Sequence, residues 1–305
     1  MSIGNNKGAV YTAAMIAVIV WGFSFIWENF LITRNIPIFT FIFERLLLAA
    51  IFMYAFAKIS GKFQKIKKGD FKWFMLLAFS EPFIYFIGEN FGIKYTGSPV
   101  MAAVIIATIP VVCIIIETFF LNISFSVWKT IGTFLTIAGI FMVVYKAGGM
   151  GVKNSYGIIL LFMAVAGSVS YSFLVNKLSD RYNAITITMW QFIIGSVLFL
   201  PPFLLFGLKG LTPDYFTLPV QGTLLALAIL CSCLCFALWV FIISKIGITS
   251  ANVFSAIIPA VSAVVAYYLG QEELTVLKVC GIALAIAGVI LAQRQSSAVA
   301  GIDKS

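Results

Sequence analysis

The chain of 305 residues is 62% hydrophobic and only 10% charged, with a formal net charge of +9 and no histidine. A soluble domain commits about a quarter of its residues to charge, so this composition excludes a water-soluble surface and indicates a chain that lies mostly in lipid. The missing histidines argue against Ser–His and Cys–His hydrolases and against most metal sites. We expect no enzymatic activity, no cofactor and no bound metal.

Ten segments of the sequence are long and apolar enough to cross a membrane. A helical span needs about 20 mostly apolar residues, since every backbone polar group must be bonded within the segment. The connecting segments are short, so no separate soluble domain is expected. The expected spans are 12–33, 39–58, 72–94, 99–121, 127–146, 156–177, 184–206, 219–243, 249–270 and 276–293.

The lysines and arginines are distributed unequally between the two sides of these spans. Counting loops alternately places thirteen on the side that holds both termini and six on the other, with Arg45 inside the second span. Basic residues accumulate in cytoplasmic loops, so we expect a multi-pass protein of the cytoplasmic (inner) membrane with both termini in the cytoplasm. This placement explains the positive charge without a nucleic-acid partner. The densest cluster, Lys58 to Lys72, is interpreted as a topology signal, with binding of anionic lipid as the alternative.

The second half of the sequence repeats the first. At an offset of 149 residues the matching pairs are Pro110 and Pro259, Lys129 and Lys278, Gly132 and Gly281, and Gly139 and Gly288. Near the start of each half, Ser24 matches Ser172 and Arg45 matches Gln191 with a slightly smaller offset. We expect two five-helix repeats, residues 1–147 and 148–305.

Because each repeat has an odd number of spans, the second repeat enters the membrane from the opposite side to the first. Inverted repeats of this kind occur in many secondary transporters, where the two halves enclose a cavity near the midplane. The expected fold class is therefore an all-α membrane protein with ten transmembrane helices in two inverted five-helix repeats. A tandem duplication without transport function is the alternative.

Motifs in both halves resemble a known family. The residues that carry the resemblance are Trp21, Gly22, Ser24, Arg45, Lys94 to Thr96, Pro110, Gly132, Gly139, Lys245 to Gly247, Pro259, Glu272, Gly281 and Gly288. As an ordered and duplicated set they resemble the EamA family of the drug/metabolite transporter superfamily. The resemblance implies a ten-helix carrier of the cytoplasmic membrane, often an exporter of amino acids or other small metabolites. The chain departs from the pattern in having Ile123 opposite Glu272 and Val169 at the position matching Trp21.

The third span carries the most informative polar residues. Glu81, Tyr85 and Glu89 recur at helical spacing, so they project over an arc of about 80°. An ionised side chain at the bilayer centre costs about 2.5–3.5 kcal/mol, so these carboxyls are expected to face protein or water. Asn90 lies nearby, and Pro82 is expected to kink the helix. We expect this face to bind substrate, with carboxyls that receive an ammonium group or take up protons; a structural hydrogen-bonded pair between helices is the alternative.

Other candidates for the substrate site lie in the first, sixth and eighth spans. Trp21, Ser24 and Glu28 share one helical stripe, and a Trp beside an acid suits an organic cation or an amino acid. Tyr171 and Trp239 are the second-half candidates by repeat symmetry. Packing of helices is the alternative for each aromatic residue.

A second group of residues is expected to be structural or gating. Arg45, with Glu44 beside it, can hold a substrate carboxylate or can clamp helices together, and Gln191 is the matching residue of the second half. Pro110 and Pro259 are expected to set kinks that serve as hinges. The glycines matched between 132–139 and 281–288 are expected to allow close helix packing. The three cysteines in 231–235 are interpreted as apolar packing rather than a metal site.

These features together predict a secondary transporter, exporting amino acids or related small metabolites by alternating access. Gradients must drive it, because no ATP-binding GxxxxGK[ST] motif occurs. The expected partners are a small-molecule substrate, the lipid bilayer and protons as candidate coupling ions; the sequence does not determine the oligomeric state. The alternatives are an uncoupled facilitator or a drug- or nucleotide-type metabolite carrier of the same fold. A channel or an intramembrane enzyme is a weaker alternative, since the four aspartates fall in loops or tails.

Overall fold

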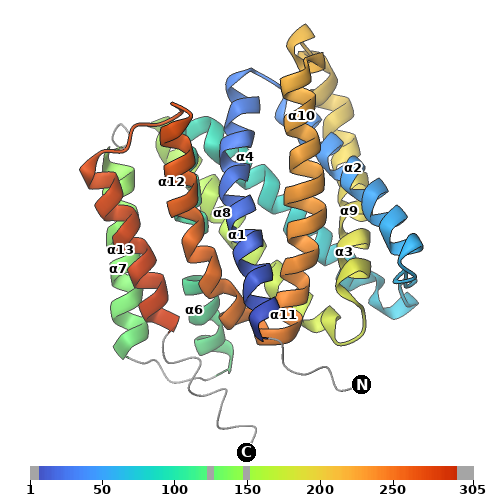
Figure 1. Ribbon diagram of the computed structural model, residues 1–305, viewed down its shortest axis with the longest axis horizontal. Helices are drawn as coiled ribbons and strands as arrows, with labels where there is room; N and C mark the ends of the chain where they lie inside the picture. The colour runs from blue at the N-terminus through green and yellow to red at the C-terminus, as the bar shows by residue number, and fades with distance from the viewer. Residues whose placement is uncertain (1–6, 122–126, 147–151, 294–305) are drawn as a thin grey trace, which may run out of the picture.

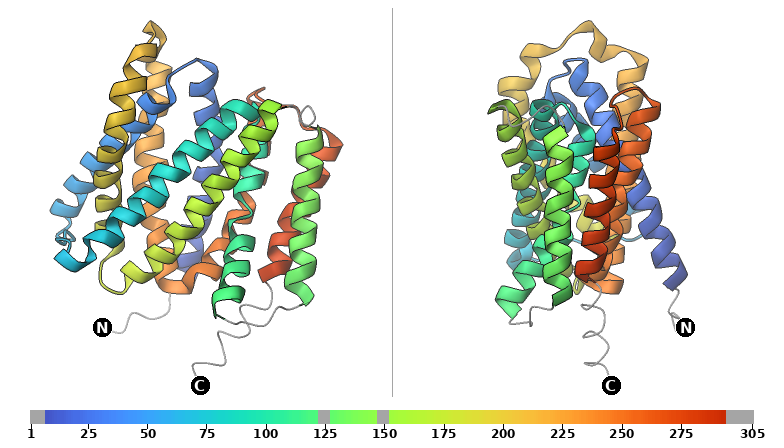
Figure 2. Two further views of the ribbon diagram at one scale, coloured as in Figure 1. Left: turned by 180° about the vertical axis from the view of Figure 1, so that it is seen from behind. Right: turned by 90° about the vertical axis from the view of Figure 1, so that its left-hand side faces the viewer.

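The structure is a computed structural model that describes residues 7–121, 127–146 and 152–293 as a bundle of helices (Figure 1). No strand occurs in these ranges. The first half contains α1 Lys7–Thr33, α2 Ile38–Ile59, α3 Phe71–Ala78, α4 Tyr85–Thr96, α5 Pro99–Ile106, α6 Ile109–Leu121 and α7 Val127–Lys146. The second half contains α8 Val152–Ser179, α9 Ala184–Pro202, α10 Leu218–Ala226, α11 Cys235–Asn252, α12 Ile258–Tyr268 and α13 Val276–Gln293. Helix α1 begins and helix α13 ends at the same end of the bundle (Figures 1 and 2).

Several of these helices are joined end to end through irregular segments. The π-helical segment η2, Phe79–Ile84, joins α3 to α4, and the π-helical segment η6, Leu227–Leu234, joins α10 to α11. The 3-10 segment η7, Val253–Ile257, precedes α12. At Gly247 the backbone φ is 78°, a left-handed conformation that glycine adopts at little cost and that separates the two helical parts of α11.

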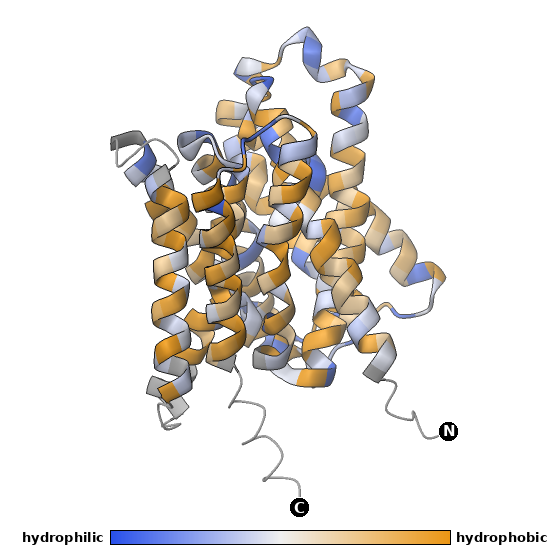
Figure 3. Ribbon diagram, turned by 60° about the vertical axis from the view of Figure 1, so that its left-hand side comes forward, coloured by the Kyte–Doolittle hydropathy of each residue, from blue (hydrophilic) through white to orange (hydrophobic). Residues whose placement is uncertain are grey.

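The expectation of ten membrane spans is met in part. Eight helical stretches are long and apolar enough to cross a membrane: Gly8–Thr33, Ile38–Ile59, Lys68–Thr96, Pro99–Ile116, Asn154–Ser179, Ala184–Gly210, Leu218–Ile248 and Ser250–Tyr268. The other two, Thr130–Tyr145 and Val276–Ala292, are apolar but shorter over the residues that the structure describes. Hydrophobic residues run along the helices while hydrophilic ones gather near the ends of the bundle (Figure 3). The chain is therefore a multi-pass membrane protein.

Helices α7 and α13 pack side by side through small residues (Figure 2). A Cβ atom added at Gly139 would lie 2.5 Å from the backbone oxygen of Gly281 and 2.5 Å from the backbone nitrogen of Ala285. One added at Gly288 would lie 2.6 Å from the backbone oxygen of Gly132. Two backbones can approach this closely only where side chains are absent. The expected packing of the matched glycines is confirmed.

At the end of the bundle that holds the start of α1, a polar cluster ties the segment before α3 to the segment between α8 and α9. Asp70 is buried, and its carboxylate accepts hydrogen bonds from Arg181 Nη1 at 2.8 Å and from the Tyr182 hydroxyl at 2.9 Å. The Tyr182 oxygen in turn accepts a bond of 3.0 Å from the backbone N–H of Lys67. Both carboxylate oxygens of Asp70 are thus satisfied, as burial requires.

Replacing Tyr182 by phenylalanine is expected to lower the free energy of unfolding by about 1–2 kcal/mol, because a buried oxygen of Asp70 loses its donor. Burial raises the pKa of Tyr182, so the hydroxyl stays protonated in the folded protein. Its contribution is complete below about pH 10 and is lost as the pH rises through the raised pKa. Thermal unfolding in detergent between pH 7 and 11 measures this; the wild type should lose stability at alkaline pH more steeply than Y182F.

Tyr268→Phe is the matched control, since the Tyr268 side chain is 81% exposed. Its stability should equal that of the wild type at every pH. Equal losses in Tyr182→Phe and Tyr268→Phe, or none in either, would contradict the assigned role of Tyr182.

Candidate functional site

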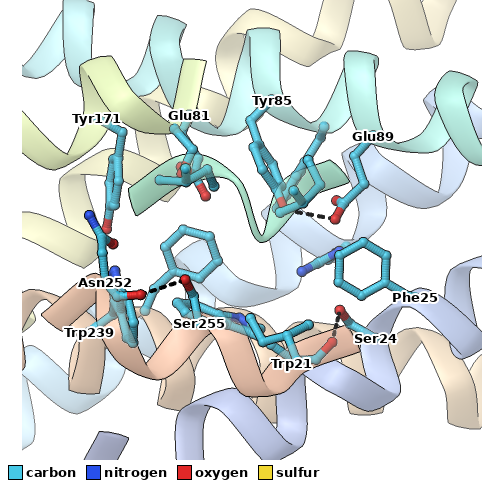
Figure 4. A pocket seen from close by; sticks show the side chains of 17 residues that line it. Trp21, Ser24, Phe25, Glu81, Tyr85, Glu89, Tyr171, Trp239, Asn252 and Ser255 are labelled. Atoms are coloured by element: carbon cyan, nitrogen blue, oxygen red, sulfur yellow. Dashed lines mark hydrogen bonds between the residues drawn. The ribbon is translucent and has the colours of Figure 1, made fainter. Parts of the chain in front are cut away.

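A small cavity of about 50 Å³ lies between the two halves of the chain (Figure 4). This volume is large enough for a few water molecules. Its polar lining residues are Ser24, Arg45, Glu81, Tyr85, Glu89, Ser168, Tyr171, Asn252 and Ser255. Its aromatic lining residues, besides the two tyrosines, are Trp21, Phe25, Phe86, Phe236 and Trp239.

One wall of the cavity is acidic and comes from η2 and the start of α4. Glu81, Tyr85 and Glu89 point toward the cavity from this side (Figure 4). The Tyr85 hydroxyl donates a hydrogen bond of 2.8 Å to Glu89 Oε1. Glu81 Oε2 is buried and has no hydrogen-bond partner among the described residues. An unsatisfied buried carboxylate oxygen is costly, so this atom is a candidate for binding a donor from a ligand or a proton.

The backbone of this wall is not the regular helix that the spacing suggested. Glu81 has φ −148° and ψ 116°, outside the helical region, and a kink interrupts the helix there. Pro82 follows directly and cannot donate a backbone hydrogen bond, so the expected kink is confirmed. Glu81 therefore does not share a regular helical face with Tyr85 and Glu89, and the predicted arc is wrong for Glu81, although all three residues line one cavity.

The opposite wall is aromatic. The Trp21 and Trp239 rings lie 5.0 Å apart between centroids at 63°, and Phe236 lies 5.4 Å from Trp21 at 78°. The Trp21 indole N–H donates to the backbone oxygen of Cys231 at 3.1 Å, which fixes α1 to η6. Ser24 donates to the backbone oxygen of Trp21 at 2.8 Å. Edge-to-face rings held in this way form a stiff surface that suits an apolar or cationic ligand.

Tyr171 from α8 joins these two walls. Its ring packs edge-on against Phe236, with centroids 6.0 Å apart, while its hydroxyl is buried without a hydrogen-bond partner in the described part of the chain. Among the described residues of the cavity wall, the Tyr171 hydroxyl and Glu81 Oε2 are thus the buried side-chain atoms without a hydrogen-bond partner.

Arg45 lies in the cavity wall and is paired with an acid that the sequence did not single out as its partner. Its Nη1 bonds Glu28 Oε1 at 2.6 Å, its Nε donates to Ser232 Oγ at 2.8 Å, and its guanidinium lies 4.3 Å from the Phe86 ring centroid. Both members of the pair are buried. Arg45 thus makes one ion-pair contact to Glu28 and one hydrogen bond to Ser232. Arg45 therefore clamps α1, α2 and η6 together and also borders the cavity.

Two of the other predicted residues lie away from the cavity. Glu44 accepts a hydrogen bond from the Tyr215 hydroxyl and is not among the residues that line the cavity. Burial and this bond raise the pKa of Tyr215, which keeps the hydroxyl protonated as a donor. Asn90 is buried and donates to the backbone oxygen of Phe86 at 3.0 Å, so it does not line the cavity. Consecutive residues of a helix point in directions about 100° apart, so Asn90 does not point into the cavity with Glu89. The prediction that Asn90 binds substrate there is therefore not supported by its position.

The remaining predicted residues, Gln191, Pro110 and Pro259, do not line the cavity. Gln191 is buried and donates to the backbone oxygen of Glu81 at 3.1 Å, which positions the kink. Pro110 stands in the first turn of α6, after the break at 107–108, and Pro259 stands in the first turn of α12, after η7. Each proline starts a new helix instead of bending a continuous one, because proline fits the first turn without losing a backbone bond.

The sequence did not indicate Ser168, Asn252 or Ser255 as lining residues. The Asn252 amide donates to Cys113 Sγ at 3.5 Å, and Ser255 donates to the backbone oxygen of Asn252 at 2.7 Å. A signal was present, since Asn252 and Ser255 are polar residues inside an apolar span just before the duplicated proline. The cysteines of 231–235 each face a different backbone carbonyl, and no cluster of three metal-ligating side chains occurs in the described residues.

Comparison with known proteins shows which family this chain resembles. The model of the EamA-like transporter family matches residues 8–145 and 155–293. A protein of Archaeoglobus fulgidus described as an uncharacterized transporter is 27% identical over 243 residues, which cover 80% of this chain and 84% of that one. A probable terminal-alkyne amino-acid exporter of Streptantibioticus cattleyicolor is 27% identical over 197 residues, 64% of each chain.

A solved crystal structure shows the same fold. It aligns with a TM-score of 0.72 and 15% identity, covering 98% of this chain and 99% of the other. The named relatives are transporters, which agrees with a transporter rather than an enzyme. Since the family match extends over both halves, this chain belongs to the EamA-like transporter family.

Proposed function

We propose that the protein is a secondary transporter of the cytoplasmic membrane that exports amino acids or related small metabolites by alternating access. The observation that carries this proposal is the cavity, in which the unpartnered Glu81 Oε2 and Tyr171 hydroxyl face a wall of aromatic rings between the two halves. The name of the S. cattleyicolor relative supports amino acids as the substrate class.

The proposed mechanism uses two inverted repeats, residues 1–147 and 148–305, that rock around the cavity. The irregular segments support this division, because η2 at 79–84 and η6 at 227–234 lie about 149 residues apart, as do the helix breaks before Pro110 and Pro259. Helix packing also supports it: α1 packs on α11 and α12, while α8 packs on α4 and α5. Ile109 and Ile258, 149 residues apart, both line the cavity.

Substrate chemistry follows from the charges of the wall. The positive charge of Arg45 is already matched by Glu28, whereas Glu81 and Glu89 face no second cation among the lining residues. We therefore place a substrate ammonium at Glu81, next to the faces of Trp21 and Trp239, where cation–π attraction adds to the ion pair. A substrate carboxylate would be placed toward Arg45. The proposed orientation has both termini in the cytoplasm, because basic residues are in excess on their side.

Glu81→Gln is expected to raise the apparent KM of transport about 10- to 100-fold, since a charged hydrogen-bond acceptor for the substrate becomes neutral. A panel of amino acids and metabolites is first screened for lost efflux in cells that lack the protein, and the identified substrate is then measured in proteoliposomes. Glu44→Gln is the matched control, because Glu44 lies in α2 but outside the cavity. Equal transport by the wild type and E81Q would overturn the placement of the ammonium at Glu81.

Coupling to protons is tested in the same vesicles by imposing a pH gradient. If Glu81 or Glu89 carries the coupled proton, transport depends on the gradient and the Glu→Gln variant of that residue loses this dependence. Unchanged pH dependence in both variants would refute the role. Flux without any gradient effect identifies an uncoupled facilitator, and unsaturated conductance identifies a channel.

A further inference from the structure

Residues 60–70 cross the end of the bundle between α2 and α3; we call this segment the basic strap. It is held in a fixed path by the second half of the chain. The Asn183 amide donates to the backbone oxygen of Lys62 at 2.9 Å, and the Trp190 indole N–H donates to that of Gln64 at 3.0 Å. The backbone N–H of Lys67 bonds the Tyr182 hydroxyl at 3.0 Å. The strap is therefore a shaped surface rather than a loose loop.

The apolar and the basic side chains of the strap differ in exposure. Phe63 and Ile66 pack against the hydrophobic core, whereas Lys62, Lys65, Lys67 and Lys68 are exposed. Lys58, Lys72, Lys177 and Arg181 extend the same surface from α2, α3, α8 and the α8–α9 segment.

The charge of this surface is strongly positive. Its eight basic side chains stand against two acids, Asp70 and Asp180. Asp70 is buried and already paired with Arg181, and no lysine of the surface forms an ion pair with a described residue. Seven ammonium groups are thus available to an anionic partner.

The side chains around the strap are of the types that gather at the depth of lipid headgroups. Lys177 Nζ lies 3.3 Å from the Trp73 ring centroid and Lys58 Nζ lies 4.1 Å from that of Phe63. Ile59 is 87% exposed, and Phe71 is also exposed, directly beside these lysines. Tryptophan, exposed aliphatic residues and lysines meet in this way where a helix leaves the hydrocarbon and enters the headgroup region. A soluble polyanion such as nucleic acid would leave these apolar side chains without a partner.

We propose that the basic strap, together with Lys58, Lys72, Lys177 and Arg181, is a binding surface for anionic phospholipid headgroups. A topology signal needs only positive charge in a loop, whereas this strap also has a fixed path and a joint surface from both halves of the chain. Bound lipid then bridges the segment before α3 and the segment after α8, outside the central cavity.

The experiment uses full-length protein in phosphatidylcholine vesicles that contain brominated phosphatidylglycerol or, separately, brominated phosphatidylcholine. Bromine quenches tryptophan fluorescence at short range, and Trp73 and Trp190 lie at the strap. We expect phosphatidylglycerol to quench more than phosphatidylcholine at equal mole fraction. The excess should fall in 0.5 M NaCl, which screens surface charge, and in W73F.

Lys65→Gln combined with Lys68→Gln should reduce the preference for the anionic lipid by up to about five-fold for each lysine. The matched control combines Lys94→Gln with Lys209→Gln, two exposed lysines from the last turn of α4 and from the segment between α9 and α10. Both of these segments lie at the opposite end of the bundle (Figure 2). This control should keep the preference. The salt titration of wild-type protein tests the proposal even if a variant misfolds.

Three outcomes would overturn the proposal: equal quenching by both lipids, an excess that salt does not change, or equal losses in the two double variants. Displacement of the lipid by inorganic phosphate at constant ionic strength would also overturn it, since the surface would then be a site for soluble phosphate. Displacement by an oligonucleotide would assign the surface to nucleic acid.

Discussion

Arg45→Met is expected to lower the free energy of unfolding by about 3–5 kcal/mol, which makes it one of the most destabilising single changes in the chain. The substitution removes the partner of the buried Glu28 carboxylate and the donor to Ser232. An uncompensated buried charge has a far larger effect than the loss of the contact itself. The methionine fills similar space, so the effect reports charge rather than a cavity.

A double-mutant cycle separates these contributions. Glu28→Gln removes the charge on the other side, and the double variant Arg45→Met with Glu28→Gln should recover a large part of the lost stability. Arg34→Met is the control, because the ion pair of Arg34 with Asp214 has side chains 39% and 38% exposed and should contribute at most about 1 kcal/mol. Thermal unfolding in detergent gives all four values. Additive losses in the cycle would show that the buried pair is not coupled.

Gly139→Ala is expected to destabilise the protein by about 1–3 kcal/mol or more, because the added Cβ would lie 2.5 Å from backbone atoms of Gly281 and Ala285. Backbone atoms cannot move aside as a flexible side chain can, so α7 and α13 must separate. The measurement is the unfolding midpoint in detergent, with chemical cross-linking between cysteines placed on α7 and α13 as a second readout of their separation.

Gly222→Ala provides the matched control within α10. A Cβ added at Gly222 has nothing within 4 Å, so the substitution should stabilise the helix by about 0.5–1 kcal/mol. Opposite signs for the two Gly→Ala changes are expected. A neutral result at Gly139 would contradict the tight packing of α7 on α13.

Some residues of the candidate site could be predicted from the sequence, and others could not. Glu81, Tyr85 and Trp21 could be selected from the sequence. A carboxyl inside a membrane span is costly unless it faces protein or water, and the two aromatic residues lie at helical spacing from an acid. The partner of Arg45 is not found this way. Several acids lie within the first four spans, and helix spacing alone cannot say which of them faces Arg45 across two helices.

The same limit applies to residues that act through the backbone. Gln191 bonds the carbonyl of Glu81 only because Pro82 and the kink leave that carbonyl outside the regular helix. Asn252 and Ser255 reach the cavity because the helix is interrupted at η7. Such breaks depend on packing between the two halves, which a linear pattern does not contain.

The sequence by itself determined that this protein lies in lipid, that it is helical and that the glycines of 132–139 and 281–288 form small-residue packing faces, because these follow from composition and from spacing along a single helix. Tertiary structure alone decided that Glu28 neutralises Arg45, that Glu44 and Asn90 turn away from the cavity, and that the lysine-rich segment 60–70 is tied to the second half. The physical reason is that these outcomes depend on which helix faces overlap across the bundle, and spacing along one helix does not contain that information.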